Sequence, residues 1–107
     1  MTAEYTDEQL ARGRRKLYQA EAWRRANPEA WGYIVSMATR QARQQQPISG
    51  RMLIEAVRHK AFTDRDGEDT KTNNDYAPIV ARWLAIEHPD TARYIEHRKT
   101  VFDLLVA

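Results

Sequence analysis

The side chains best suited to recognition chemistry lie around the start of one predicted helix, between residues 71 and 82. Asparagine can form two hydrogen bonds to adenine, and arginine can bind guanine or grip a phosphate. Asn73 and Asn74 precede the helical pattern directly, and the N–H groups at a helix start attract a phosphate oxygen. These features predict a nucleic-acid contact, whose candidate residues are Lys71, Asn73, Asn74, Tyr76, Arg82, Arg51 and Arg58.

The same asparagines also have a purely structural interpretation. Asn and Asp favour turns and the residue just before a helix, where the side chain accepts a hydrogen bond from a free backbone N–H. We expect Asn74 or Asp75 to cap this helix and Pro78 to lie in its first turn. For each of these residues taken alone, capping is the more common role.

No set of side chains in the sequence points to catalysis or metal binding. Paired carboxylates, a nucleophile with its base, and a phosphate-binding glycine loop cannot be assembled from these spacings. The chain has no cysteine, His59 has no histidine four residues away, and the acidic residues around Gly67 lack the spacing of a calcium loop. We therefore expect no enzymatic activity, no cofactor and no metal ion.

The net charge of +2 hides an uneven distribution. Residues 1–60 contain eleven Lys and Arg against six Asp and Glu, whereas residues 61–107 contain six against nine. Basic residues near phosphates release condensed counterions, so the basic half favours nucleic acid as a partner. A solvated, arginine-rich helix surface without any such partner is an equally ordinary reason for this charge.

A second set of candidate recognition residues lies in a first helix that we expect over residues 7–25. Thr6 and Gln9 have the spacing of a capping box at its start. Its apolar stripe is thin and basic residues cover its other faces. Residues 1–27 are therefore either partly detached from a core of residues 28–107, or ordered against a partner. The candidate partner-binding residues are Arg14, Arg15, Trp23 and Arg24.

Three further helices are expected in the core. Pro28 follows a capping asparagine and starts the second helix, Ser49 caps the third, and the fourth begins near Pro78. Apolar residues recur in these helices at the spacing of one buried face. The expected buried residues are Trp31, Ile34, Val35, Ala38 and Ala42 in the second helix, Leu53, Ala56 and Val57 in the third, and Ile79, Val80, Trp83 and Leu84 in the fourth.

The remaining segments complete the predicted fold. Asp66-Gly67 is a strong turn signal, so a short β-hairpin between the third and fourth helices is the favoured interpretation of that acidic loop. Residues 101–107 fit a closing helix or a strand equally, and such an apolar tail is either docked on the core or forms a homodimer surface. We predict a mostly α domain of four to five helices, with or without the hairpin.

The sequence has no membrane-spanning run and no apolar signal core near Met1. We therefore expect a soluble protein of the cytoplasm that does not bind a membrane.

The run from Lys71 to Pro78, followed by Ala81-Arg82, Pro89 and the sequence Tyr94-Ile95-Glu96-His97-Arg98, resembles a group of small proteins encoded by bacteriophages and prophages. Members of that group usually read Phe-Lys-Ile-Asn-Asn, then an aromatic residue and an Ala-Arg helix. The resemblance covers residues 48–98, but Thr70 and Thr72 stand where an aromatic and an aliphatic residue are usual. It implies a phage or prophage origin, and for a phage protein the cytoplasm of the host cell, rather than an activity.

Two function classes follow from these residues. The first is a DNA-binding transcription regulator of divergent, winged helix-turn-helix type, which would bind duplex DNA with the helix start at residues 71–82. The loop before that helix is much longer than the connection of an ordinary helix-turn-helix, and its acids would repel phosphates. The second class is a protein-interaction module that binds and redirects a host protein through the charged first helix.

Overall fold

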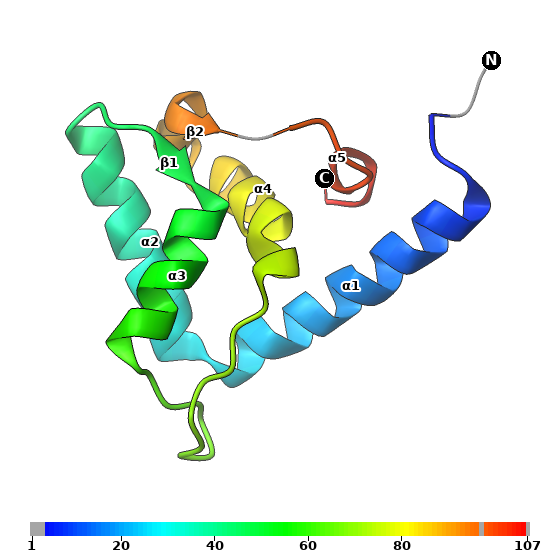
Figure 1. Cartoon of the computed structure of the whole chain (residues 1–107). Coiled ribbons are helices and arrows are strands. Elements are labelled where there is room, and N and C mark those ends of the chain that lie inside the picture. Colours follow the sequence, from blue (N-terminus) through cyan, green and yellow to red (C-terminus); the bar gives the residue numbers. More distant parts are fainter. Residues whose placement is uncertain (1–3, 97, 107) are drawn as a thin grey trace.

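The computed structural model describes residues 4–96 and 98–106 and shows a mostly helical protein, as predicted. Helices α2 and α3 lie side by side and antiparallel, α4 packs across them, and α1 extends away as an arm that meets α5 (Figure 1). The elements are α1 (Asp7–Ala26), α2 (Pro28–Arg43), β1 (Ile48–Ser49), α3 (Gly50–Lys60), the 3-10 helix η1 (Asn74–Tyr76), α4 (Ala77–Glu87), the 3-10 helix η2 (Pro89–Tyr94), β2 (Ile95–Glu96) and α5 (Phe102–Leu105).

Side-chain caps start two of the helices as predicted. Thr6 and Gln9 form the reciprocal capping box of α1, with hydrogen bonds of 2.8 and 3.1 Å. The Ser49 hydroxyl accepts the N–H of Met52 at the start of α3. The predicted cap of the fourth helix was wrong by at least one residue, because the short helix η1 precedes α4 and Asn73 caps η1 instead.

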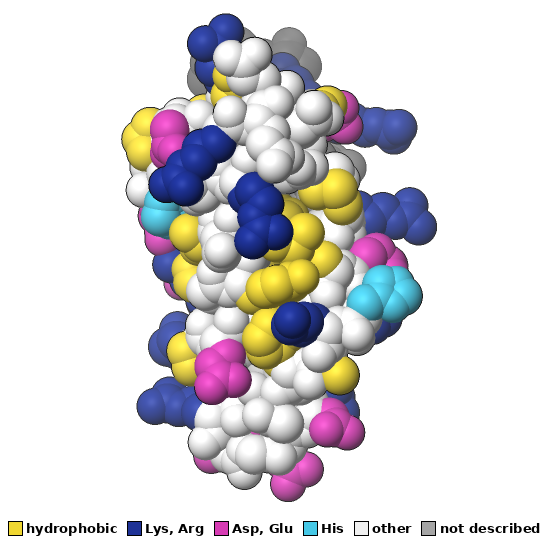
Figure 2. Space-filling model, turned by 90° about the vertical axis from the view of Figure 1, so that its left-hand side faces the viewer, with side chains coloured by type: hydrophobic (Ala, Val, Ile, Leu, Met, Phe, Trp, Pro, Cys, Tyr) yellow, Lys and Arg dark blue, Asp and Glu magenta, His cyan; other side chains and the backbone are white. Residues whose placement is uncertain are grey.

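The core lies where α2, α3 and α4 meet. All four buried residues predicted in the fourth helix, Ile79 to Leu84, are buried. In α2 the most buried residues repeat every fourth position and are mainly alanine, which lets the neighbouring helix approach closely. Ile54 of α3 is also fully buried, although it was not among the residues expected in the core. Hydrophobic side chains also run along the outer face of α2 and α3 (Figure 2).

A parallel pair of two-residue strands joins the two halves of the chain. Ile48 pairs with Ile95 and Ser49 with Glu96. The helix that follows β1 then lies directly against the start of α4, because a Cβ on Gly50 would be only 2.3 Å from the Ala77 carbonyl oxygen. No side chain larger than hydrogen fits at that crossing without moving one helix.

The acidic loop, which we define as residues 64–69, has the predicted turn but little strand. One antiparallel bridge joins Thr63 to Asp69, and Gly67 adopts a φ of 83°. The Asp64 carboxylate accepts hydrogen bonds from the N–H groups of Asp66 and Glu68 and so closes the turn from inside. A hairpin-like loop therefore stands where a β-hairpin was expected.

Helix α1 is docked near both of its ends. The Trp23 indole N–H donates to the Lys71 carbonyl at 2.6 Å near one end. Near the other end, Gly13 is buried and packs against Val101 and Leu105 of the chain's closing segment. That segment forms one helical turn, α5, so of the two predicted alternatives for the tail the structure has the helix. No helix in the described ranges combines the length and apolarity needed to cross a membrane.

Candidate nucleic-acid interface

Arg58 gathers several of the predicted recognition residues into one network. Its guanidinium donates to the Thr72 hydroxyl at 2.9 Å, to the Asn74 side-chain oxygen at 3.1 Å and to the Glu55 carboxylate at 2.8 Å. These bonds tie the middle of α3 to the segment that leads into α4. Both Arg58 and Asn74 are exposed, but the Arg58 guanidinium and the Asn74 side-chain oxygen are already engaged in this network.

Arg82, for which a DNA contact was predicted, is almost entirely buried. Only 6% of the residue is exposed. Its guanidinium donates to the Asp103 carboxylate and the Arg98 carbonyl at 2.8 Å, and to the Pro78 carbonyl at 2.7 Å. The side chain holds the segment 98–103 against α4, and protein oxygens engage its hydrogen-bond donors.

The other predicted recognition residues before α4 do not form one face. The Tyr76 ring packs against Trp23, with centroids 6.1 Å apart. The Asn73 side chain is used as a cap, while the Lys71 side chain is exposed. Residues 61–76 separate α3 from α4, far more than the 3 to 4 residues that join a helix-turn-helix pair. The two helices therefore do not form that unit.

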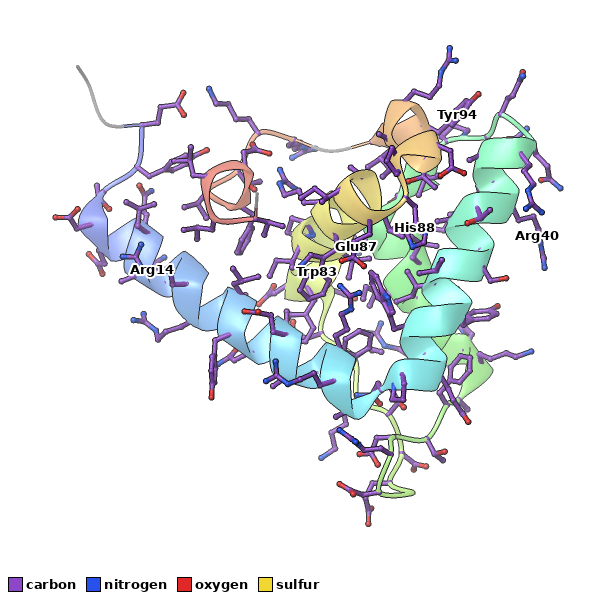
Figure 3. All side chains as sticks on the ribbon, turned by 180° about the vertical axis from the view of Figure 1, so that it is seen from behind. Arg14, Arg40, Trp83, Glu87, His88 and Tyr94 are labelled. Carbon is purple, nitrogen blue, oxygen red and sulfur yellow. The ribbon has the colours of Figure 1, made fainter. Side chains whose placement is uncertain are left out.

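Trp23 and Arg24, which were predicted to bind a partner, make contacts within the fold. Trp23 is 9% exposed, and Arg24 makes two hydrogen bonds of 2.6 Å to Glu87. The guanidinium also lies over the rings of Trp31 and Trp83, 4.1 and 5.0 Å from their centroids. These hydrogen bonds hold the pKa of Glu87 below its usual value, against the opposing effect of burial. Figure 3 shows Trp83 and Glu87 on the side of α4 that faces α1 and α2.

Two of the predicted partner-binding residues, Arg14 and Arg15, are exposed on α1. One turn further along the same helix is Tyr18, which is 71% exposed. Tyr18 was not among the predicted binding residues, although it lies between two basic clusters of α1 and that position is a signal for it. Arg14 on α1 and Arg40 on α2 lie on opposite sides of the molecule (Figure 3).

Five exposed arginines gather where β1 and β2 pair, a region that we call the arginine end. It comprises Arg40, Arg43, Arg51, Arg93 and Arg98. The elements that carry them contact one another, since α2 packs on β1 and η2, α3 packs on β1, and β1 pairs with β2. None forms an ion pair with any residue that the structure describes. The same elements also carry the acids Glu29, Glu55, Asp90 and Glu96.

The acidic loop lies at the opposite end of α2 and α3. The 16 residues of α2 span about 24 Å at a rise of about 1.5 Å per residue. The Arg65 N–H donates to the Ala26 carbonyl, so the acidic loop lies next to the start of α2, whereas Arg43 ends that helix. Four acids and one arginine occupy the loop. The protein thus carries opposite charges at its two ends.

The described part of the chain contains no group of three or more acidic or histidine side chains that could hold a metal ion. Comparisons with protein-family models, with curated proteins and with solved structures found no match to this chain.

Proposed function

We propose that this protein binds duplex DNA without chemistry, as a small regulator of phage type, and that it grips the phosphate backbone with the arginine end. The observation that supports this is the gathering of five exposed arginines that have no carboxylate partner among the described residues. Arginine offers a planar fork of donors that matches phosphate geometry. The distant acidic loop disfavours the reverse orientation on a phosphate surface.

Backbone contact of this kind has a measurable electrostatic signature. Each neutralised phosphate contributes about −0.9 to the slope of log K against log salt, so five contacts give about −4.5. Raising the salt from about 50 to about 200 mM should then weaken binding roughly 500-fold. Phosphate contacts carry no sequence information, so this surface supplies affinity and orientation on the duplex.

The test measures the binding of a fluorescent duplex over that range of salt. The variant Arg40→Ala/Arg43→Ala/Arg93→Ala should lose about three contacts and reduce the steepness of the slope by about 2.7. No binding of the original protein at about 50 mM salt would reject the proposal.

A matched control separates the arginine end from total charge. The variant Arg14→Ala/Arg15→Ala/Arg25→Ala removes three exposed arginines from α1 and changes the net charge by the same amount. We expect its salt slope to equal that of the original protein. An equal loss in both variants would show that charge alone, and not the arginine end, governs binding.

The exposed face of α1 favours a second candidate, the binding of a host protein. Tyrosine and arginine are enriched among residues that dominate interface energies, and α1 presents Tyr18 beside Arg14 and Arg15. A pull-down with Tyr18→Ala as the comparison tests this function. A host protein recovered by the original chain and lost with Tyr18→Ala supports it, whereas recovery of the same proteins by both chains rejects it.

A further inference from the structure

We infer that the cavity beside the start of α3 is a binding site for the phosphate group of a nucleotide, either free or at the end of a nucleic-acid strand. The cavity has a volume of about 520 Å³ and lies between the first turns of α3 and α4 and the segment after β2. This inference deepens the proposed function and rests on it for the biological source of the ligand.

Strand register places two cations in this cavity. Ser49 pairs with Glu96, and Arg51 and Arg98 each follow by two residues. Both arginines line the same cavity, and neither makes an ion pair or side-chain hydrogen bond with a described residue. Neighbouring like charges repel each other, and an anion shared between them removes that repulsion.

Arg82 adds a fixed wall to the same cavity. Its guanidinium is held by three protein oxygens, and its charge is balanced by Asp103. The excess charge of the cavity therefore comes from Arg51 and Arg98, reduced by Glu96, which also lines it. A single negatively charged group fits this balance better than a chain of phosphates.

The size of the cavity and its apolar walls indicate what is attached to the phosphate group. Small-molecule sites commonly have volumes of about 300 to 1,000 Å³, and this cavity is too large for a phosphate ion alone. Ala77, Pro78 and Ala81 line it with apolar surface. A sugar and base fit against that surface while the phosphate lies near the two arginines, which defines a nucleotide as the ligand class.

Inorganic phosphate and adenosine monophosphate are the first two probes. Their binding to the full chain is detected by NMR of the backbone amides. Both should shift the amides of residues 49–51 and 98–100, and adenosine monophosphate should bind more tightly than phosphate because of its apolar contacts. Absence of shifts with both probes at low millimolar concentration overturns the inference.

Three variants make the test specific. Arg51→Ala and Arg98→Ala should each weaken the binding of adenosine monophosphate about tenfold, the effect expected for a charged hydrogen bond. Glu96→Gln removes the opposing carboxylate and should tighten binding severalfold, a gain that a misfolded variant cannot produce. Arg43→Ala, whose side chain belongs to the arginine end but does not line the cavity, should leave this affinity unchanged. An equal loss with Arg43→Ala overturns the inference.

Oligonucleotides with a 5′-phosphate or a 5′-hydroxyl distinguish the two sources of the nucleotide. A preference for the 5′-phosphate assigns the cavity to strand ends, and equal weak binding of both beside tight binding of the mononucleotide assigns it to a free nucleotide. Duplex binding that persists while both small probes fail would overturn the cavity site and leave the proposed function intact. Binding of the small probes without duplex binding would reject the proposed function alone.

Discussion

Replacement of Arg82 by alanine should destabilise the protein strongly, because the buried guanidinium joins α4 to the segment 98–103. The change removes the guanidinium donors from the carbonyl oxygens of Pro78 and Arg98 and from one carboxylate oxygen of Asp103. Removing one partner of a buried ion pair costs about 3 to 5 kcal/mol. The Asp103 side chain is 34% exposed and water can replace part of its interaction, so we expect the lower end of that range, about 3 kcal/mol.

Urea unfolding followed by tryptophan fluorescence measures this effect. For a domain of about 100 residues, a loss of about 3 kcal/mol also lowers the melting temperature by roughly 12 °C or more. Arg82→Lys keeps the charge but loses the fork of donors, so its stability should fall between those of Arg82→Ala and the original protein. Arg14→Ala, at an exposed site, should change stability by less than about 0.5 kcal/mol. If Arg82→Ala unfolds at the same urea concentration as Arg14→Ala, the interior role assigned to Arg82 is refuted.

One close helix contact, one exposed glycine and one ion pair give three further predictions. Gly50→Ala should lower the free energy of unfolding by about 1 to 3 kcal/mol, because its Cβ would overlap the backbone oxygen of Ala77. Thermal unfolding at the same temperature as the original protein would contradict this packing. Gly32→Ala is the matched control in the exposed middle of α2, where a Cβ meets nothing within 4 Å, and it should raise stability by about 1 kcal/mol. The lowered pKa of Glu87 beside Arg24 makes its contribution to stability present above the unfolded pKa of about 4.3 and lost as the pH falls through the folded value. Because this carboxylate is 37% exposed, that contribution should be below about 1 kcal/mol, and Glu87→Gln should remove the corresponding acid dependence of the urea midpoint.

Local signals in the sequence predict the helices well. The capping box at Thr6 and the apolar stripe from Ile79 to Leu84 both act over a few residues, so neighbouring side chains are sufficient to recognise them. The same reasoning failed at Asn73, since a cap displaced by one short 3-10 turn has almost the same composition as the predicted one.

Long-range contacts decide the candidate site, and a local pattern cannot predict them. The role of Trp23 depends on a carbonyl 48 residues away, and two-residue strands such as β1 and β2 are too short to show a period. Arg82 did carry one signal. It lies in a helix whose apolar residues surround it on all sides, so a charged side chain there has to be paired inside the protein. The DNA-binding, host-protein and phage predictions stay predictions.

The pairing of residue 48 with residue 95 also affects how the chain can fold during its synthesis. Contacts between distant residues cannot form until the later partner has left the ribosome, and closing so long a loop slows the folding of small domains. The ion pair of Arg82 forms later still, since its carboxylate partner is residue 103. The α2–α3 pair can associate early as a local unit. In contrast, α4 lacks the ion pair between Arg82 and Asp103 until Asp103 has been synthesised. Nascent chains stalled before residue 95 should therefore expose the apolar sides of α2 and α3 to chaperones.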